Sequence, residues 1–307
     1  MKFVKPLFWN SKNIISIILF PLSLITLIIN ELKELNSKKK FLIKTICVGN
    51  TYLGGTGKTS LAIEIQTLLK KKFKTVFIKK NYINQLDEIN LLKTKGKLIS
   101  KDSREEALYL ASKKKYELAI LDDGLQQKNI NYDLKIICFN AEDGFGNNFL
   151  LPAGPLRESI NKVKKYDIAF INGEKKNNDL YLKLKSINKE IQIFEGKYKP
   201  LNLKRFNLKK KYLMFCGIGN PHEFEQTLVK NKFIIKERII YADHYKIPNE
   251  IFNKLRLKAK NENLSIVTTE KDFFRLSKSQ RKNIKYLKIS LEIKDIKKFK
   301  KLLISKL

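Results

Sequence analysis

Glycine, lysine and threonine gather in one short stretch whose residue types and spacing suit phosphate binding. It reads Gly-Gly-Thr-Gly-Lys-Thr over residues 54–59. Glycines let the backbone approach an anion without clashes from side chains, so that N–H groups can surround a phosphate. Lys58 would place a positive charge at the β- and γ-phosphates, and the Thr59 hydroxyl would bind Mg²⁺. The predicted nucleotide-binding residues are Gly54, Gly55, Thr56, Gly57, Lys58, Thr59 and Ser60.

The elements on either side of this stretch must position it. Residues 45–48 are apolar and rich in β-branched side chains, which predicts a buried strand, and residues 61–69 have helical spacing. A strand, a glycine-rich turn and a helix N-terminus together form a common phosphate-binding unit. Tyr52 stands where the general pattern has its first glycine, so a plain turn is the alternative interpretation. Leu53 argues against the ATPases of the partitioning type, which have a similar loop with lysine there.

Two adjacent carboxylates, Asp122 and Asp123, follow a second apolar run at residues 118–121. A carboxylate at the end of a buried strand downstream of a phosphate-binding loop is the expected second anchor for Mg²⁺. An ordinary Asp-Gly turn with Gly124 is the alternative.

The remaining pattern alternates strands and helices, which predicts an α/β fold. We expect a P-loop NTPase-like α/β/α lobe over residues 37–175 and a second, smaller α/β/α lobe over 176–307, with a polar boundary at 177–188. Residues 150–158 are rich in Gly and Pro and predict a shaped loop. A helix beginning after Ser103, a helix beginning at Pro221 and a helix over 249–261 are also predicted.

Residues 1–36 are expected to form an N-terminal membrane-associated helix. The run from Ile14 to Ile29 is almost wholly apolar, with lysines and aromatic residues before it. A signal peptide is disfavoured because no small-residue cleavage site follows. The run is shorter than the roughly 20 residues that span a bilayer, so a helix embedded in the inner leaflet fits best. A core helix of a soluble domain is the remaining alternative.

The amino-acid composition limits the kinds of molecule that the protein is expected to bind. The formal net charge of +33 comes almost entirely from lysines spread through the chain. This distribution favours anionic membranes and phosphorylated ligands, and without a basic run interleaved with aromatic residues it predicts no nucleic-acid partner. Cys47, Cys138 and Cys216 lie far apart in apolar runs, so they are expected to be core residues in a reducing compartment.

Several motifs, in this order, resemble those of the tetraacyldisaccharide 4′-kinase family, the lipid A 4′-kinases. They are Val-Gly-Asn (48–50) with Gly-Gly-Thr-Gly-Lys-Thr (54–59), Asp-Asp-Gly-Leu-Gln (122–126), Gly-Phe-Gly-Asn (144–147), Leu-Leu-Pro-Ala-Gly-Pro-Leu-Arg-Glu (150–158), Gly-Ile-Gly-Asn-Pro (217–221), Ala-Asp-His-Tyr (242–245) and Thr-Glu-Lys-Asp (269–272). The resemblance implies ATP- and Mg²⁺-dependent phosphorylation of the 4′-hydroxyl of an acylated glucosamine disaccharide 1-phosphate in lipid A (lipopolysaccharide) biosynthesis. It also implies a peripheral or monotopic enzyme at the cytoplasmic face of the bacterial inner membrane.

Residue roles follow from the same resemblance. Asp87 is implied as the catalytic base, with His244 from the second lobe as its partner and Lys58 as a catalytic cation. Gln126 would contact the nucleotide, and Asp122 and Asp123 would hold the metal with Thr59. The expected substrate or phosphate contacts are Lys80, Arg104, Arg157 and Glu158. Taken alone, Asp87 could equally be a carboxylate of a polar turn, and His244 would more often be a structural histidine. A solvated helix face is the alternative for Arg104.

The chain departs from the family pattern in three places. Lys-Lys-Asn-Tyr stands at 79–82 where the family usually has Ser-Arg-Gly-Tyr, and the segment before Asp87 is shortened. Gln127 replaces a histidine.

A different class, a membrane-associated regulatory or transport P-loop NTPase, is the alternative function. Such a protein would hydrolyse ATP without any acylated sugar.

Overall fold

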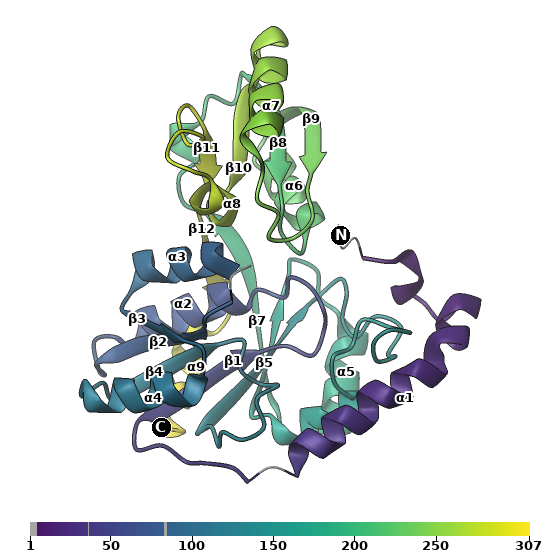
Figure 1. Cartoon of the computed structure of the whole chain (residues 1–307), viewed down its shortest axis with the longest axis vertical. Coiled ribbons are helices and arrows are strands. Elements are labelled where there is room, and N and C mark those ends of the chain that lie inside the picture. The colour runs from purple at the N-terminus through teal and green to yellow at the C-terminus, as the bar shows by residue number, and fades with distance from the viewer. Residues whose placement is uncertain (1–4, 36, 83–84) are drawn as a thin grey trace. The chain divides into compact units, whose positions relative to one another are not determined.

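The computed structural model describes residues 5–35, 37–82 and 85–307, which fall into two compact units (Figure 1). The larger unit comprises Lys5–Asn81, Lys95–Lys197 and Leu291–Leu307. Within the described residues, the smaller unit comprises Tyr82–Thr94 and Tyr198–Ser290. The expected α/β class is confirmed. The expected bounds differ from these units, because the larger unit extends to Lys197 and also takes in the C-terminal helix.

The larger unit is built on an eight-stranded sheet with the strand order β12-β7-β6-β5-β1-β4-β2-β3. From β7 to β3 in this order, each strand pairs in parallel with the next one. The strands are β1 (Lys44–Gly49), β2 (Thr75–Lys80), β3 (Leu98–Lys101), β4 (Leu118–Asp122), β5 (Leu134–Asn140), β6 (Ile168–Asn172), β7 (Gln192–Pro200) and β12 (Ile289–Ile293). The carboxyl ends of parallel strands share one edge, where ligands of such sheets bind. The phosphate-binding stretch follows β1 and the aspartates end β4, so both lie at this edge.

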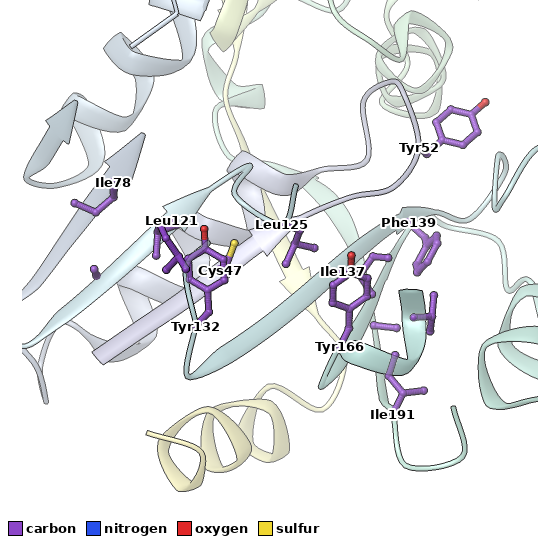
Figure 2. Packing of buried hydrophobic residues seen from close by; sticks show 14 of the residues in the cluster. Cys47, Tyr52, Ile78, Leu121, Leu125, Tyr132, Ile137, Phe139, Tyr166 and Ile191 are labelled. Carbon is purple, nitrogen blue, oxygen red and sulfur yellow. The ribbon is translucent and has the colours of Figure 1, made fainter. Parts of the chain in front are cut away.

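Alternate residues of these strands form the core on one face of the sheet. Ile78, Leu121, Ile137 and Phe139 belong to this core (Figure 2). It also takes buried side chains from α4 (Arg104–Lys113) and α5 (Asn178–Ile187). Helix α2 (Lys58–Leu69) packs on β1 and β4. Each of the three cysteines is buried and free, as expected, and burial raises the pKa of the Cys47 thiol to about 12.

The polar stretch 177–188 is a helix of the larger unit, so its interpretation as a boundary between lobes is wrong. Leu180 and Leu184, four residues apart, are buried on one face of α5. Asn177 caps the helix by accepting a hydrogen bond from the Leu180 N–H. The lysines of this stretch occupy a helix surface, and two leucines at i,i+4 spacing suffice to anchor a helix to a core.

The smaller unit contains a four-stranded parallel sheet of order β11-β10-β8-β9. Its elements are β8 (Lys211–Cys216), β9 (Ile234–Ile240), β10 (Ser265–Thr269), β11 (Lys285–Leu287), α3 (Leu86–Lys95), α6 (Pro221–Lys230), α7 (Asn249–Asn261) and α8 (Glu270–Arg275), with the short 3₁₀ helix η4 (Leu203–Arg205). On β8, Tyr212 and Met214 join one core while Leu213 and Phe215 join the other. The sheet is therefore covered on both faces. The helices predicted after Ser103, at Pro221 and over 249–261 are confirmed.

The N-terminal apolar run belongs to the larger unit and forms α1 (Ile14–Glu34), a 21-residue helix containing Pro21. A capping box between Asn13 and Ser16 begins it. It is longer than the sequence run suggested, because Asn30 to Glu34 continue the helix. Its apolar side chains are mostly exposed, whereas its buried residues are the polar Ser16, Ser23 and Asn30. Among the residues described, α1 is the one helix whose length and composition suffice to cross a membrane.

A cluster of charges ties the end of α1 to the body of the larger unit. The Glu34 carboxylate lies 2.6 Å from Lys165 Nζ and 3.5 Å from the Nζ atoms of Lys128 and Lys162. Burial alone would raise the pKa of Glu34, but the hydrogen bond from Lys165 and the three lysine charges outweigh it and lower the pKa to about 2. The ionised carboxylate therefore stabilises the folded state.

We expect Glu34→Gln to lower the free energy of unfolding by about 1 kcal/mol at neutral pH, after allowance for solvent screening. A depressed folded pKa gives stability that is fully present above the unfolded value of 4.5 and lost as the pH falls to about 2. Chemical denaturation of both proteins at pH 7 and near pH 3 measures the difference. A gap between wild type and variant that stays constant over this range would contradict the assignment.

Candidate active site

The phosphate-binding stretch forms the predicted turn between β1 and α2. Gly57 is the N-cap of α2 and has φ 83°, a left-handed conformation that strongly favours glycine. Lys58 is the first residue of α2, so its position coincides with the positive end of the helix. The sequence prediction of a strand, a glycine-rich turn and a helix is confirmed.

Asp122 lies at the centre of the site of the larger unit. Its side chain is fully buried, and its Oδ2 atom accepts hydrogen bonds from Thr59 Oγ1 at 3.0 Å and from Lys79 Nζ at 2.8 Å. Strands β1 and β4 are adjacent, which places the end of β4 beside the start of α2. The structure thus brings together Thr59 and Asp122, two of the three predicted metal ligands.

Asp123 points to a different partner. Its φ is 63°, and its Oδ1 accepts a hydrogen bond from Arg157 Nη2 at 3.0 Å. Burial alone would raise the pKa of Asp123, but the positive charges of Lys58, Arg157 and Lys79 hold it well below its usual range. Arg157 Nη2 also donates to the backbone carbonyl of Asn50 at 2.8 Å. Asp123 therefore holds Arg157 beside the phosphate-binding stretch.

Three further residues of the larger unit were predicted to contact the nucleotide, its phosphates or the substrate: Arg104, Gln126 and Lys80. Arg104 is buried and donates to the Asp123 carbonyl, so a solvated helix face is wrong for it. Gln126 Nε2 donates to the Asn50 carbonyl at 2.8 Å. Lys80 ends β2 and is half-buried.

Glu158 differs from the expected substrate contact. Its side chain is fully buried, its Oε2 accepts a hydrogen bond from Tyr166 at 2.9 Å, and it pairs with Lys128 at 3.0 Å. Because a carboxylate enclosed in this way has its charge compensated internally, its geometry favours a structural role.

Unpartnered polar atoms test whether a nucleotide and a metal fit this site. Among the described residues, buried atoms without a hydrogen-bond partner include Thr51 Oγ1, Thr56 Oγ1, Asp122 Oδ1 and Arg157 Nε. Buried polar atoms are normally paired, so these atoms are available to the polar groups of a nucleotide or to a metal ion. In the described part of the chain, no group of three or more His, Cys, Asp or Glu side chains is arranged so that it could hold a metal ion by itself. This suits Mg²⁺, which commonly takes one or two protein carboxylates and completes its shell with phosphates and water.

Lys79 is a residue of this site whose role sequence reasoning missed, and it carries a prediction. Lys79→Met leaves the buried Asp122 carboxylate without its cation, which should lower the free energy of unfolding by about 3–5 kcal/mol. A bound divalent cation would replace the missing positive charge. We therefore expect Mg²⁺ with ATP to raise the melting temperature of Lys79→Met more than that of the wild type, as measured by calorimetry.

The matched control for this prediction is Lys101→Met, which removes a partly exposed lysine at the end of β3, beside β2, whose side chain pairs with Glu106 of α4. Exposed pairs contribute at most about 1 kcal/mol, so its melting temperature and its response to Mg²⁺ with ATP should match the wild type. Equal ligand-induced shifts in Lys79→Met and wild type would refute the role of Lys79 at Asp122.

Within the smaller unit, Asp87 and His244 are in direct contact. Asp87 Oδ1 accepts a hydrogen bond from His244 Nδ1 at 3.0 Å. The expectation that they come from different lobes is wrong, because the segment 82–94 belongs to the smaller unit. Asp87 lies in the first turn of α3, where a carboxylate is favourable because the helix N-terminus is positive.

Cations surround the Asp87 carboxylate. Its Oδ2 lies 2.6 Å from Arg275 Nη2 and 3.8 Å from Lys271 Nζ. Burial alone would raise the pKa of Asp87, but the hydrogen bond from His244 and the charges of Lys271 and Arg275 hold it well below its usual range. The Asp87 side chain is 1% exposed and that of His244 is 19% exposed. Asp87 is thus a buried anion, and His244 is the more accessible member of the pair.

The backbone around His244 is held in an uncommon conformation. His244 has φ 60°, and its N–H donates to the Gly217 carbonyl at 3.2 Å. A Cβ on Gly217 would lie 2.9 Å from the Ala242 carbonyl oxygen, so only glycine fits there. Asp272 accepts from the Gly217 N–H at 3.0 Å and pairs with Arg275 at 2.8 Å. The three family-like motifs of this unit therefore converge on one scaffold, and strain of this kind is often found at functional sites.

A cavity of about 480 Å³ adjoins this scaffold within the smaller unit. Its lining includes Asp87, Asn90, Tyr245, Lys246, Arg275 and Gln280. His222, the other histidine, is exposed at the start of α6 and contacts Gln226 within the same helix.

Sequence reasoning gave no site role to Lys79, Lys271 or Arg275. Lys271 is part of the Thr-Glu-Lys-Asp motif, which was a usable signal, and Lys79 stands at a departure from the family pattern. Arg275 lies four residues beyond Lys271, and that spacing places both on one side of a helix. Nothing in the local sequence pairs either residue with Asp87, because that pairing depends on how distant segments pack.

The fold and the phosphate-binding turn define an α/β protein of the P-loop class. The model of the family described as tetraacyldisaccharide-1-P 4′-kinase matches residues 15–307. The chain therefore belongs to the tetraacyldisaccharide 1-phosphate 4′-kinase family, which confirms the resemblance found in the sequence, and it is a kinase of lipid A biosynthesis.

Relatives and a solved structure agree with this assignment. A tetraacyldisaccharide 4′-kinase of Pelagibacter ubique is 45% identical over 97% of this chain and 96% of its own length. A tetraacyldisaccharide 4′-kinase of Rickettsia canadensis is 32% identical over 95% of this chain and 94% of its own length. The crystal structure of LpxK from Aquifex aeolicus in complex with ATP covers 95% of this chain and 99% of that one, at 22% identity and a TM-score of 0.69. This last match supports the fold.

Proposed function

We propose that this chain transfers the γ-phosphate of ATP to the 4′-hydroxyl of an acylated glucosamine disaccharide 1-phosphate. Membership of the family supports the substrate class and the use of ATP. The observation that carries the proposal is the contact of Thr59 and Asp122 at the N-terminus of α2, in a site with several unpartnered buried polar atoms. Phosphoryl transfer depends mainly on positioning and on neutralising charge, which this arrangement suits.

The larger unit would bind the triphosphate. Backbone N–H groups of residues 54–59 and the start of α2 would surround the β- and γ-phosphates, and Lys58 would neutralise their charge. Thr59 and Asp122 would hold Mg²⁺, with Asp123 orienting Arg157 beside them. Mg²⁺, when bound, supplies positive charge to the phosphate oxygens. Arg157 can then stabilise charge that develops on the transferred group.

The smaller unit would supply the proton acceptor. A sugar hydroxyl must lose its proton as it attacks, and a carboxylate or imidazole within hydrogen-bond reach speeds that loss. Asp87 alone is a weak base, because its pKa is held far below the usual range. We propose that Asp87 and His244 accept the proton as one unit, with Lys271 and Arg275 fixing the orientation of the carboxylate.

The membrane surface is the proposed location. The exposed face of α1 carries Ile17, Leu24, Ile25 and Ile28, whereas the polar Ser16, Ser23 and Asn30 are buried against the protein. An apolar face of this kind, on a lysine-rich protein, suits the boundary of an anionic bilayer. We propose that α1 seats the enzyme at the cytoplasmic face of the inner membrane, where the acyl chains of its substrate lie.

The direct test of the reaction is incubation of the full chain with ATP, Mg²⁺ and tetraacyldisaccharide 1-phosphate in mixed micelles. Mass spectrometry should show a bisphosphorylated product, with the new phosphate at the 4′ position. Hydrolysis of ATP at the same rate without the lipid, and no bisphosphorylated product with it, would favour the regulatory or transport NTPase instead.

Replacement of the exposed face tests the location better than deletion of α1, because the helix is packed into the larger unit. Ile17→Ser, Ile25→Ser and Ile28→Ser together should reduce sedimentation with anionic vesicles and leave the melting temperature in detergent unchanged. Sedimentation equal to that of the wild type would refute the membrane face. A fall in melting temperature would show instead that these side chains belong to a core.

A further inference from the structure

Three polar residues of α1, Ser23, Thr26 and Asn30, form a polar stripe that bonds to the backbone of one loop. Ser23 Oγ donates to the Leu150 carbonyl at 2.8 Å, and Thr26 Oγ1 donates to the Leu151 carbonyl at 2.8 Å. Asn30 Nδ2 donates to the Arg157 carbonyl at 2.7 Å. Ser23 and Asn30 are 2% and 8% exposed. A largely apolar helix thus places three polar side chains against residues 150–157.

That loop in turn bonds to the backbone just before the phosphate-binding stretch. The Arg157 N–H donates to the Thr51 carbonyl at 2.7 Å, and the Leu53 N–H donates to the Pro155 carbonyl at 2.8 Å. The Arg157 guanidinium reaches the Asn50 carbonyl at 2.8 Å. The loop 150–157 therefore links two parts of the protein. Asn30 connects it to α1, and Arg157 connects it to the residues just before the phosphate-binding stretch.

We infer that Ser23, Thr26 and Asn30 are positioning residues for ATP binding, which act through Arg157 and the loop 150–157. Asn30 is the main one, because it bonds to the carbonyl of the same residue whose guanidinium contacts Asn50 and Asp123. The helix has two separate faces: the polar stripe supports the nucleotide site, and the apolar face is left for a surface outside the protein. This inference rests on the proposed nucleotide role of residues 54–59.

The physical basis is the fixing of a loop that has no regular structure of its own. The loop 150–157 is joined to the rest of the larger unit largely through backbone carbonyls and N–H groups. A buried carbonyl that loses its hydrogen-bond donor is energetically unfavourable, so the loop is expected to shift until the carbonyl bonds to water. The guanidinium of Arg157 would then lose its fixed direction, and catalytic or binding groups act well only when they are held in place.

The test compares the affinity for a fluorescent ATP analogue in detergent, with no lipid acceptor present. Asn30→Leu keeps the side-chain volume and removes the donor, so we expect the Kd to rise about three- to tenfold. Asn30→Leu combined with Ser23→Ala and Thr26→Val should raise it about tenfold or more. The single variants Ser23→Thr and Thr26→Ser keep the hydroxyl donors and should bind the analogue with wild-type affinity.

Ser16→Ala is the matched control on the same helix. Ser16 is fully buried, yet its side chain bonds to Asn13 within the helix start and not to the loop. This variant should therefore leave the Kd unchanged at temperatures where the protein is folded. An equal rise in Kd for Ser16→Ala would show that the helix acts only through general stability, and would overturn the inference.

A double-mutant cycle with Arg157 isolates the route. If Asn30 acts through Arg157, Asn30→Leu should add little to the Kd of Arg157→Ala, because the guanidinium that it positions is already gone. Effects of the two changes that multiply would refute the positioning role. Failure of the wild type to bind the analogue would refute the nucleotide site itself, and intact nucleotide binding without transfer to the lipid would refute only the proposed reaction.

Discussion

Lys58→Ala is expected to lower the rate of phosphate transfer about 100-fold or more. Lys58 begins α2 and its charge reaches the neighbouring Asp123, so it lies where a triphosphate would need a cation. Removal of one group that stabilises developing charge typically costs about 10²- to 10³-fold in rate. Thr59→Ala should have a comparable effect, because it removes the hydroxyl that contacts Asp122. Steady-state transfer assays with radiolabelled ATP measure both.

The matched control is Lys70→Ala, which removes an exposed lysine just beyond the other end of α2. Its rate should equal that of the wild type, and circular dichroism should show that all three variants are folded. Near wild-type transfer by either Lys58→Ala or Thr59→Ala would refute the assignment of the phosphate-binding stretch.

Asp87→Ala is expected to lower kcat about 100-fold or more, with a smaller effect on the KM for either substrate. His244→Ala should act in the same way, because the two side chains are joined by a hydrogen bond of 3.0 Å. The double variant should be little worse than the poorer single one, since two groups that act as a unit are lost together. Measurement of kcat and KM for the three variants tests this.

The control for the pair is His222→Ala, which removes the other histidine from an exposed helix start. It should leave kcat unchanged. Because Asp87→Ala exposes the charges of Arg275 and Lys271 to each other, its melting temperature is measured beside that of His244→Ala, in which those cations keep their carboxylate. Retention of more than about a tenth of the rate by a folded Asp87→Ala, or losses that multiply in the double variant, would refute the pair.

Many elements of both units could be predicted from the sequence because their signals are local. The turn at residues 54–59 requires glycine at a left-handed position, and the apolar runs before it and before Asp122 predict buried strands. Capping residues likewise predicted the starts of α4 and α6. Each such signal depends on a few consecutive residues, so the chain order alone conveys it.

The division of the chain into units could not be read in this way. Residues 82–94 belong with residues more than a hundred positions later, because Asp87 is bonded to His244 and Arg275. The polar stretch 177–188 looked like a boundary, since two buried leucines among lysines give only a weak helical signal.

The sequence by itself determined the family and the phosphate-binding turn, and it identified Asp87, His244 and Asp122 as candidate site residues. Only the tertiary structure decided which groups they meet. Lys79 neutralises Asp122, Arg275 and Lys271 surround Asp87, and the polar stripe of α1 supports the loop of Arg157. The physical reason is that a buried charge or carbonyl takes the partner that long-range packing brings to it, and that partner leaves no mark in the neighbouring sequence.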